Sequence, residues 1–332
     1  MEYRFLGKTG VKVSAMCLGC MTFGNEADEE TSTQIIDAFL AAGGNFLDTA
    51  NVYSRGLSEE IVGRALFGRR RDVVLATKVR FTMGDGPNDV GASRFHIVRS
   101  VEDSLRRLQT DVIDLYQIHA WDPATPLEET MRALDDLVRQ GKVLYLGVSN
   151  FAAWQTMKAL CVSAVNGLAR FDCVQPQYSL IEREIERELI PLCLSEGLGV
   201  IPWSPLGGGF LTGKYTRESQ PSEARLTKMR SAPFENVWDK RATERNWATL
   251  DVVRQVAAAR GVTPAQVAIA WVMAQPGVTA PIIGARNLDQ LHDNLLAAEL
   301  QLTPDELNTL DEASRLESVY PYRFIENAIK TR

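Results

Sequence analysis

Short apolar runs alternate with longer polar-and-apolar segments along this chain, after a distinct start at the N-terminus. Residues 1–14 read as two short strands joined by a turn at Gly7 to Gly10, which predicts a β-hairpin. Each later run has the length of one buried strand. The runs are AMCLG (15–19), NFLDT (45–49), VVLATKV (73–79), IDLYQIH (113–119), VLYLGVS (143–149), CVQP (173–176), GVIPWS (199–204) and TAPIIGA (279–285).

The segments between these runs carry helix signals. Apolar residues recur at the spacing of one helix face at Ile97, Val101, Leu105 and Leu108. In the pattern Thr-Pro-x-Glu/Gln, the threonine caps a helix, proline fits the first turn, and Glu or Gln bonds back to the cap. This pattern begins at Thr125, Thr263 and Thr303. Gly141 and Gly197 are placed to end helices.

Strand-then-helix units repeated over 332 residues predict an α/β protein with a single (β/α)₈ TIM barrel domain spanning residues 1–332. The segment 205–246 is too long and too polar for a simple connection. We therefore expect a partly helical lid after the seventh strand, and further helices at the C-terminus. In such barrels the chemistry lies at the C-terminal ends of the strands.

Polar residues stand at the ends of the predicted strands. Asp48 ends the second, Lys78 the third and His119 the fourth. An unpaired buried carboxylate costs several kcal/mol, so Asp48 needs a cation, and Lys78 on the neighbouring strand is a candidate. The later strands end in Ser149 and Asn150, Gln175, Trp203 and Ser204, and the sequence Gly284-Ala285-Arg286.

Composition and charge narrow the class of protein. The chain is 45% hydrophobic and 23% charged, which is ordinary for a soluble globular protein. Its net charge of −6 argues against nucleic acid or an anionic membrane surface as a partner. It has no signal-peptide pattern and no apolar run that would span a bilayer, so we expect a cytoplasmic location. Nothing in the sequence indicates the oligomeric state.

The five cysteines favour reduced thiols, because an odd number cannot pair completely within one chain. Cys17 and Cys20 form a C-x-x-C pattern, but it lies in a predicted strand rather than at the start of a helix. We expect both to pack in the core. No metal site is expected.

Several long stretches resemble the aldo-keto reductases, which are NAD(P)H-dependent carbonyl reductases on a (β/α)₈ barrel. The stretches are NFLDTANVYSRGLSEEIVGRAL, LATKV, DLYQIHAWDPATPLEETMRALDDLVRQGKVLYLGVSNF, VQPQYSL, IPWSPLGGGFLTGKY and PIIGARNLDQLHDNL. The resemblance covers essentially the whole chain. It implies a catalytic tetrad of Asp48, Tyr53, Lys78 and His119. Ser54 follows the tyrosine where glycine is common in related sequences, which affects the loop rather than the chemistry.

The residue types of this tetrad suit carbonyl reduction. Negative charge develops on the carbonyl oxygen, so a proton donor must stand beside it. Tyr53 would be that donor, and the Lys78 cation would make it a stronger acid by stabilising the phenolate. Asp48 would hold Lys78, and His119 would donate a hydrogen bond to the carbonyl oxygen. Each residue alone is more often a structural one, but their joint placement on adjacent strands favours the functional interpretation.

The resemblance also implies an NADPH or NADP⁺ site on the later strands. Ser149, Asn150 and Gln175 are expected at the nicotinamide carboxamide, with Trp203 stacked on the ring. Further cofactor-binding candidates in the next segment are Ser204, Leu206, Gly208 and Lys214. The adenosine 2′-phosphate and adenine are expected at Gly284, Arg286, Gln290 and Asn294. No acidic residue directly follows Arg286 to repel a phosphate.

One stretch resembles a different phosphate-binding motif. Residues 208–214 nearly form the P-loop pattern G-x-x-x-x-G-K, but Tyr215 stands where the Ser or Thr that holds Mg²⁺ would be. The chain contains no G-x-G-x-x-G, so a Rossmann half is not supported. Lys214 and the nearby backbone N–H groups remain suited to a dinucleotide pyrophosphate.

Three functions stay open at this point. The first is reduction of an aldehyde or ketone by NADPH, with Phe23, Trp121 and the aromatic tail at 319–324 as candidates for the substrate pocket. The second is a non-catalytic barrel that binds nucleotide and regulates a partner, as channel-associated subunits of this family do. The third is a Schiff-base aldolase that uses Lys78.

Overall fold

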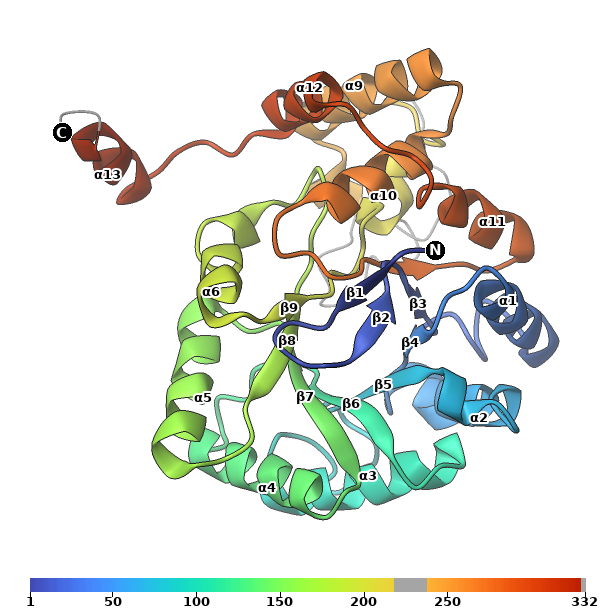
Figure 1. The fold of residues 1–332 in the computed structure, drawn as a ribbon, viewed down its shortest axis with the longest axis vertical. Helices are drawn as coiled ribbons and strands as arrows, with labels where there is room; N and C mark the ends of the chain where they lie inside the picture. Colours follow the sequence, from blue (N-terminus) through green and yellow to red (C-terminus); the bar gives the residue numbers. More distant parts are fainter. Residues whose placement is uncertain (218–237, 330–332) are drawn as a thin grey trace.

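Eight parallel strands form the central sheet of the protein (Figure 1). The computed structural model describes residues 1–217 and 238–329. The strands follow the order β10-β3-β4-β5-β6-β7-β8-β9 across the sheet. Their bounds are β3 (Cys17–Gly19), β4 (Phe46–Asp48), β5 (Val74–Val79), β6 (Ile113–Ile118), β7 (Val143–Ser149), β8 (Phe171–Gln175), β9 (Gly199–Val200) and β10 (Ile282–Gly284). Each overlaps one predicted run, so the eight-strand prediction is confirmed.

Backbone hydrogen bonds between β9 with the residues after it and β10 with the residues before it close the sheet into a barrel. Thr279 N donates to Val200 O at 2.7 Å, and Ile282 N donates to Pro202 O at 2.8 Å. Strand β9 is only two residues long, shorter than the predicted run 199–204. Pro202 lies in that run and lacks an N–H group, so it cannot donate to a ladder.

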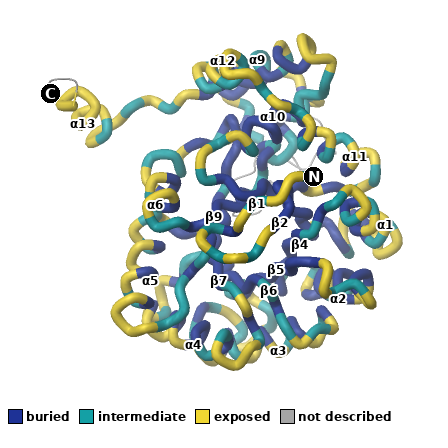
Figure 2. Tube along the Cα trace, viewed as in Figure 1, coloured by how far each residue is buried: buried dark blue, intermediate teal, exposed yellow. Residues whose placement is uncertain are grey.

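Helices surround the barrel, and neighbouring helices contact each other in the order α10, α11, α1, α2, α3, α4, α5, α6 (Figure 1). Figure 2 shows buried residues along the strands and exposed residues on the outer faces of the helices. The bounds are α1 (Glu29–Ala41), α2 (Leu57–Ala65), α3 (Arg94–Leu108), α4 (Leu127–Arg139), α5 (Ala153–Asn166), α6 (Leu189–Glu196), α10 (Pro264–Ala274) and α11 (Leu288–Leu296). Short 3-10 turns lie at η1 (Tyr53–Gly56), η2 (Arg70–Asp72), η3 (Glu184–Glu186) and η4 (Gly207–Thr212).

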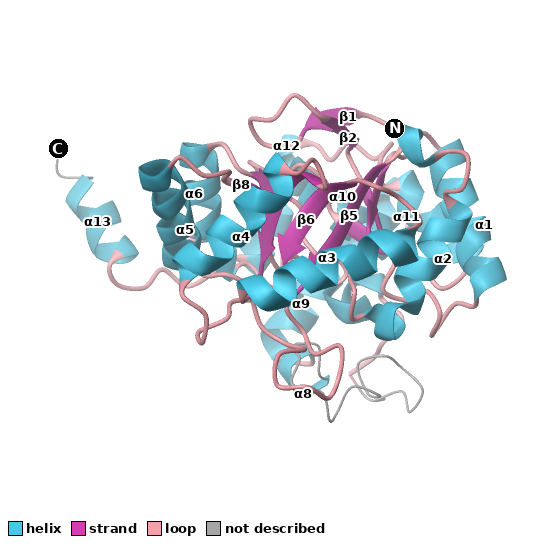
Figure 3. Ribbon diagram, turned by 90° about the horizontal axis from the view of Figure 1, so that it is seen from below, coloured by secondary structure: helices cyan, strands magenta, loops and turns pink. Residues whose placement is uncertain are grey.

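The predicted N-terminal hairpin forms from β1 (Tyr3–Phe5) and β2 (Lys12–Ser14). Leu6 and Val13 are fully buried and pack with barrel-interior residues such as Phe46 and Leu115. Figure 3 shows the hairpin at one end of the barrel and α8 (Trp238–Arg241) at the other. The hairpin therefore covers the N-terminal ends of the strands and leaves the C-terminal ends for the chemistry.

The predicted extra helices are present after β9 and at the C-terminus. α9 (Glu244–Arg260) contacts both α10 and α12 (Pro304–Ser314), outside the ring of helices. α13 (Tyr322–Ile329) has no buried residue and stands away from the barrel (Figures 1 and 3). Of the predicted lid at 205–246, residues 218–237 lie outside the described residues. No single described helix is long and apolar enough to cross a membrane, although α9 and α10 pass such a test as a pair bent by 102°.

The three predicted capping patterns have different outcomes. Thr303 forms the complete box with Glu306. Thr263 caps α10, but the Gln266 side chain donates to Asp293 Oδ1 at 2.7 Å instead of returning to the cap. The prediction for Thr125 was wrong, because the cap of α4 is the next residue and Thr125 Oγ1 donates to the Asp122 carboxylate at 2.7 Å. The Thr125 hydroxyl thus donates to an ionised carboxylate, and hydrogen bonds to charged groups are stronger than those between neutral groups.

The cysteines of the C-x-x-C pattern lie in the core. Cys17 begins β3, Cys20 follows its end, and both side chains are fully buried without a disulfide. Burial raises the pKa of each thiol, so neither is a reactive thiolate at neutral pH. The packing prediction is confirmed.

Candidate active site

A buried ion pair between two adjacent strands forms the centre of the candidate site. Asp48 ends β4, and Lys78 is the penultimate residue of β5. Lys78 Nζ lies 2.5 Å from Asp48 Oδ2, 2.8 Å from Thr49 O and 3.3 Å from the Tyr53 hydroxyl. An ammonium group has three N–H donors. These partners therefore engage all of them, and the tyrosine hydroxyl is one.

The second carboxylate oxygen of Asp48 is held by two side-chain amides, one from β6 and one from β8. Gln175 Nε2 donates to Asp48 Oδ1 at 2.8 Å, and Gln117 Nε2 donates at 3.0 Å. Gly147 lies against this network, since a Cβ there would come within 2.9 Å of Gln117 Cγ. Both carboxylate oxygens are hydrogen-bonded, which lets the buried charge persist.

The loop that carries Tyr53 has an unusual backbone. Ser54, Arg55 and Gly56 have φ angles of 47°, 54° and 98°. Glycine adopts this left-handed region freely, whereas other residues seldom do. Ser54 offsets part of that cost because its hydroxyl donates to Phe23 O at 2.8 Å. Ser54 therefore adopts this left-handed conformation with its hydroxyl tied to the Phe23 backbone.

The sequence element Gly-x-Ser-Glu anchors this loop to the barrel. Ser58 Oγ donates to Cys20 O at 2.8 Å. The Glu59 carboxylate is fully buried, accepts from Thr77 Oγ1 at 2.6 Å and pairs with Arg107 Nε at 2.7 Å. Thr77 precedes Lys78 on β5, so the same element fixes the loop and the strand of the ion pair.

His119 follows the end of β6 and faces the tyrosine ring. The two ring centroids lie 5.7 Å apart, and Phe81 contacts the imidazole from another side at 4.6 Å. His119 is buried, and its Nδ1 atom has no hydrogen-bond partner among the described residues. The structure thus brings Asp48, Tyr53, Lys78 and His119 together at the C-terminal ends of three adjacent strands.

Burial and charge set the protonation of these groups. Burial would lower the pKa of Lys78, but Asp48 and Tyr53 raise it above its usual value. Burial raises the pKa of Tyr53, and the Lys78 cation opposes this without outweighing it. Burial, Lys78 and Arg80 hold the pKa of His119 well below its usual value. At neutral pH the site therefore holds an ammonium group, a phenol and a neutral imidazole.

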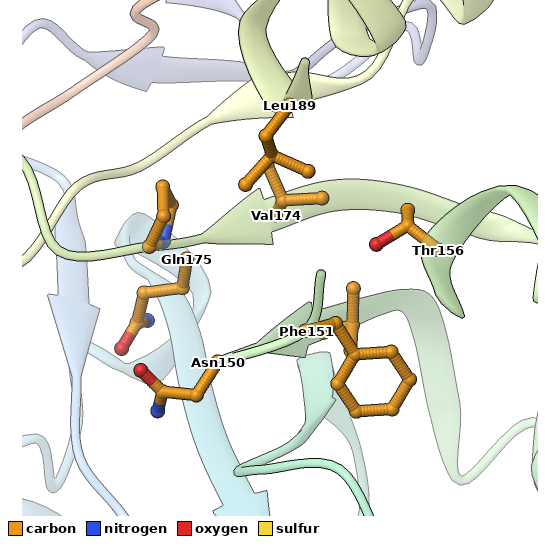
Figure 4. A pocket seen from close by; sticks show the side chains of 8 residues that line it. Asn150, Phe151, Thr156, Val174, Gln175 and Leu189 are labelled. Carbon is orange, nitrogen blue, oxygen red and sulfur yellow. The ribbon is translucent and has the colours of Figure 1, made fainter. Parts of the chain in front are cut away.

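The residues expected at a nicotinamide lie together at the ends of β7 and β8. Ser149 Oγ donates to Gln175 O at 2.8 Å, and Asn150 Nδ2 donates to His119 O at 2.8 Å. Trp203 Nε1 donates to Asn150 Oδ1 at 3.2 Å. Figure 4 shows the Asn150 and Gln175 side chains on the same side of the strand ends, beside a narrow crevice. The Gln175 amide is already committed to Asp48, so its N–H groups serve the ion pair first.

The stretch after β9 turns back on itself at consecutive glycines. Gly207, Gly208 and Gly209 have φ angles of 58°, 70° and 93°, within the short turn η4. Ser204 Oγ accepts from Gly208 N at 3.0 Å, and Leu206 O accepts from Gly209 N at 3.0 Å.

A cation lies against this turn. A Cβ at Gly209 would come within 3.2 Å of Lys214 Nζ. No helix follows within residues 213–217, unlike in a P-loop.

Arg286 has an acidic partner that the sequence did not indicate. Its Nε atom pairs with the carboxylate of Glu26, which lies in the loop before α1. Gln290 Oε1 accepts from Arg286 N at 3.0 Å, and Asn294 Nδ2 donates to Gly284 O at 3.1 Å. No acidic residue directly follows Arg286 in the sequence, but the fold brings the distant Glu26 carboxylate to its guanidinium.

The candidate substrate residues differ in exposure. Phe23 is fully buried in the main hydrophobic cluster, so its ring packs rather than lining an open surface. Trp121 is partly exposed and contacts Phe151 and Trp154 edge to face. The tail at 319–324 leads into α13, away from the barrel (Figure 1). The structure therefore does not bring that tail to the tetrad.

Three polar residues near the tetrad, Gln117, Asn51 and Arg80, were not singled out from the sequence. Asn51 is buried, and neither amide atom has a hydrogen-bond partner in the described parts of the chain. Arg80 directly follows β5, two residues beyond Lys78. The only sequence feature that indicated a role for Asn51 was its position between Asp48 and Tyr53. Within residues 1–217 and 238–329, no group of three or more His, Cys, Asp or Glu is placed to hold a metal ion.

Comparisons with known proteins place the chain in a family that agrees with its barrel fold. The family model "Aldo/keto reductase family" matches residues 15–315. The chain belongs to the aldo/keto reductase family.

Similar curated proteins span nearly its full length. It is 42% identical to the uncharacterized oxidoreductase YrpG of Bacillus subtilis, covering 94% of this chain and 95% of that protein. It is 37% identical to versiconal hemiacetal acetate reductase of Aspergillus parasiticus, covering 97% and 99%. It is also 37% identical to a probable voltage-gated potassium channel subunit beta of Oryza sativa, covering 94% and 96%. The family and these relatives support an oxidoreductase that acts on carbonyl groups.

Proposed function

We propose that this protein reduces aldehydes or ketones to alcohols with NADPH, and that Tyr53 is the general acid. The observation that carries the proposal is the contact of the Tyr53 hydroxyl with Lys78 Nζ at 3.3 Å, while Asp48 holds the same ammonium group. Bound NADPH would supply hydride to the carbonyl carbon. Tyr53 would give its phenolic proton to the carbonyl oxygen, and Lys78 would stabilise the phenolate that remains.

His119 would orient the substrate in this reaction. Its pKa is held low by burial and by the charges of Lys78 and Arg80. The neutral ring carries one N–H, which would donate to the carbonyl oxygen. A neutral donor leaves Tyr53 as the group that transfers the proton, because a neutral imidazole is a much weaker acid than an imidazolium.

The residues of the later strands fit a dinucleotide. Asn150 and Ser149 offer polar groups at the nicotinamide end, and the Trp203 ring lies beside Asn150. The glycine turn after β9 keeps Cβ atoms away from a pyrophosphate, and Lys214 lies against it. Arg286 would meet the 2′-phosphate of NADPH with the donors that Glu26 does not use.

An aldolase mechanism at Lys78 has little support. A Schiff-base lysine must lose its proton to act as a nucleophile, so such lysines have lowered pKa values. Lys78 is fully buried, all three donors are engaged, and Asp48 and Tyr53 hold its pKa above the usual value. A regulatory barrel remains the second candidate, because relatives are named potassium channel subunits.

A panel of aldehydes and ketones, monitored through NADPH absorbance, tests the proposal. We expect turnover with some members of the panel, and a loss of roughly 10²-fold or more in Lys78→Met, on general-acid magnitudes. NADPH binding without reduction of any member would favour the regulatory barrel instead. Borohydride trapping of a substrate adduct on Lys78 would support the aldolase.

A further inference from the structure

Arg80 lies beside the candidate site, and its side chain has no hydrogen-bond or ion-pair partner among the described residues. It directly follows β5, two residues after Lys78, and is partly buried. Its Nε atom is buried and has no acceptor within the described ranges. An arginine that is partly buried usually has an anionic or carbonyl partner, because its N–H donors lose water.

The charge of Arg80 acts on the site. Its guanidinium stacks on Phe81 at 5.4 Å, and Phe81 in turn contacts the His119 ring at 4.6 Å. Arg80 helps to hold the pKa of His119 low and also lowers that of Asp122. The guanidinium is thus close to the imidazole that would meet the carbonyl oxygen.

The nearby carboxylate of Asp122 is committed elsewhere. It accepts hydrogen bonds from Ala92 N at 2.7 Å, from Ala124 N at 3.1 Å and from Thr125 Oγ1 at 2.7 Å. These bonds tie the β5–α3 and β6–α4 loops together. Asp122 therefore serves the loops, and within residues 1–217 and 238–329 no carboxylate forms an ion pair with the Arg80 guanidinium.

The backbone at Arg80 is strained. Its φ is 138°, in a region that glycine tolerates and that a branched or long side chain rarely adopts. Its carbonyl oxygen accepts from Gly91 N at 2.8 Å, which holds the strained geometry in place. A strained non-glycine residue beside a catalytic group is a recurrent feature of ligand-binding positions.

We propose that Arg80 recognises an anionic group, carboxylate or phosphate, on the aldehyde or ketone substrate. The inference rests on the proposed function, since it places the reacting carbonyl at Tyr53 and His119. A guanidinium would bind such a group with paired hydrogen bonds, and Trp121 and Phe81 would contact the apolar part of the substrate. The substrate class is therefore a carbonyl compound that carries a negative charge.

Pairs of substrates that differ only in charge test this proposal, with the full chain and NADPH. 4-Carboxybenzaldehyde and methyl 4-formylbenzoate share one carbonyl and differ in charge. We expect kcat/KM for the acid to exceed that for the ester by about 10- to 100-fold, the range for a hydrogen bond to a charged group. Arg80→Met should bring that ratio to about one by lowering only the acid. Glyceraldehyde 3-phosphate and glyceraldehyde form the corresponding pair for phosphate. The pair whose kcat/KM ratio falls more in Arg80→Met identifies the preferred anion.

Two further variants separate recognition from folding. Arg99 also stacks on a phenylalanine, 5.0 Å from the Phe95 ring on α3, so Arg99→Met is a matched control that should leave the ratio unchanged. Arg80→Gly removes the charge and relieves the backbone, so it should raise Tm while abolishing the preference for the acid. A lower Tm with an unchanged ratio would show that Arg80 serves the fold.

Calorimetric binding of 4-(hydroxymethyl)benzoate to the NADP⁺ complex gives an answer that does not depend on turnover. We expect Arg80→Met to weaken this binding by about 10-fold or more. If neither aldehyde is reduced but this difference appears, the proposed reaction fails and the anion site stands. Equal loss of acid and ester turnover, or equal binding in wild type and Arg80→Met, overturns the role of Arg80.

Discussion

Arg286 shows how one contact changes the expected cofactor energetics. Its pairing with Glu26 places a carboxylate where a 2′-phosphate would approach the guanidinium. Both side chains are partly exposed, so the pair contributes about 1 kcal/mol or less. A phosphate with up to two charges competes well against that pair, since charge-assisted bonds to arginine are stronger and bidentate. The expected preference for NADPH over NADH therefore persists, but is smaller than an unpaired arginine would give.

Replacing either partner tests this expectation. Arg286→Ala should weaken NADPH binding by roughly 10- to 100-fold and leave NADH little changed. Glu26→Gln should strengthen NADPH binding by about fivefold, because the guanidinium no longer has a competing carboxylate. Dissociation constants of NADPH and NADH, measured for the wild type and both variants, test these two expectations. Strong loss of NADH binding in Glu26→Gln would mean that Glu26 holds a ribose hydroxyl instead.

His119 links the site to the pH dependence of stability. Its pKa in the folded chain lies well below the ordinary value near 6.5, because of burial and the charges of Lys78 and Arg80. The unfolded chain thus binds a proton at this residue that the folded chain does not, as pH falls below about 6.5. The free energy of unfolding should therefore fall between about pH 7 and pH 5, by up to about 1.4 kcal/mol per pH unit from this residue.

Urea titrations at several pH values measure that slope. His119→Gln should flatten it, whatever its effect on stability at pH 7. His292 is exposed on α11, so His292→Gln is a matched control that should leave the slope near that of the wild type. An unchanged slope in His119→Gln would show that the imidazole is not held neutral in the folded chain.

At the scale of elements, the 3-10 turn after β4 and the start of α2 depend on one buried carboxylate. Glu59 joins Thr77 on β5 to Arg107 on α3, across the loop that carries Tyr53. Glu59→Ala would leave the partly buried Arg107 without its partner. The free energy of unfolding should fall by about 3–5 kcal/mol, as for other broken buried pairs.

A neighbouring residue supplies the control for this prediction. Glu60 pairs with Arg64 on the surface of the same helix, at 3.7 Å. Glu60→Ala should cost no more than about 0.5 kcal/mol, measured by the same denaturation. Equal losses in the two variants would show that the Glu59 network does not anchor the loop.

The sequence predicted the elements of this fold better than their fine contacts. Eight strands, the hairpin and the helix ends at Gly141 and Gly197 follow from local periodicity and backbone preferences, and the structure has them. Asp48, Lys78 and His119 converge because parallel strands place their C-terminal ends together, and Tyr53 joins them from the loop after β4. Such features depend on neighbours in sequence or on the geometry of the fold.

Contacts between distant residues left no local signal. Glu26 meets Arg286 from the other end of the chain, and Gln117 and Gln175 reach Asp48 from strands β6 and β8. The position of α13 depends on tertiary contacts such as the bond from Tyr322 OH to Glu188 Oε1 at 2.7 Å. Arg80 has no signal in the sequence, because its positive φ and its lack of a polar partner among the described residues arise only in the folded chain.

Across the whole molecule, apolar and polar groups separate along the barrel axis. The N-terminal end is closed by the hairpin, whose Leu6 and Val13 pack into the barrel interior. The C-terminal end holds Asp48, Lys78 and the amides around them. Low dielectric around the ion pair strengthens its effect on Tyr53. That the full range 1–332 forms one domain stays a prediction.

The most direct test of the account is the rate of carbonyl reduction in Tyr53→Phe. This change removes the phenolic oxygen and keeps the ring beside His119, so NADPH affinity should stay within about twofold of the wild type. Reduction of 4-nitrobenzaldehyde, monitored through NADPH absorbance, should fall by roughly 10²-fold or more, on the magnitude of general-acid catalysis. Turnover close to that of the wild type, with NADPH bound, would contradict the assignment of Tyr53 as the acid.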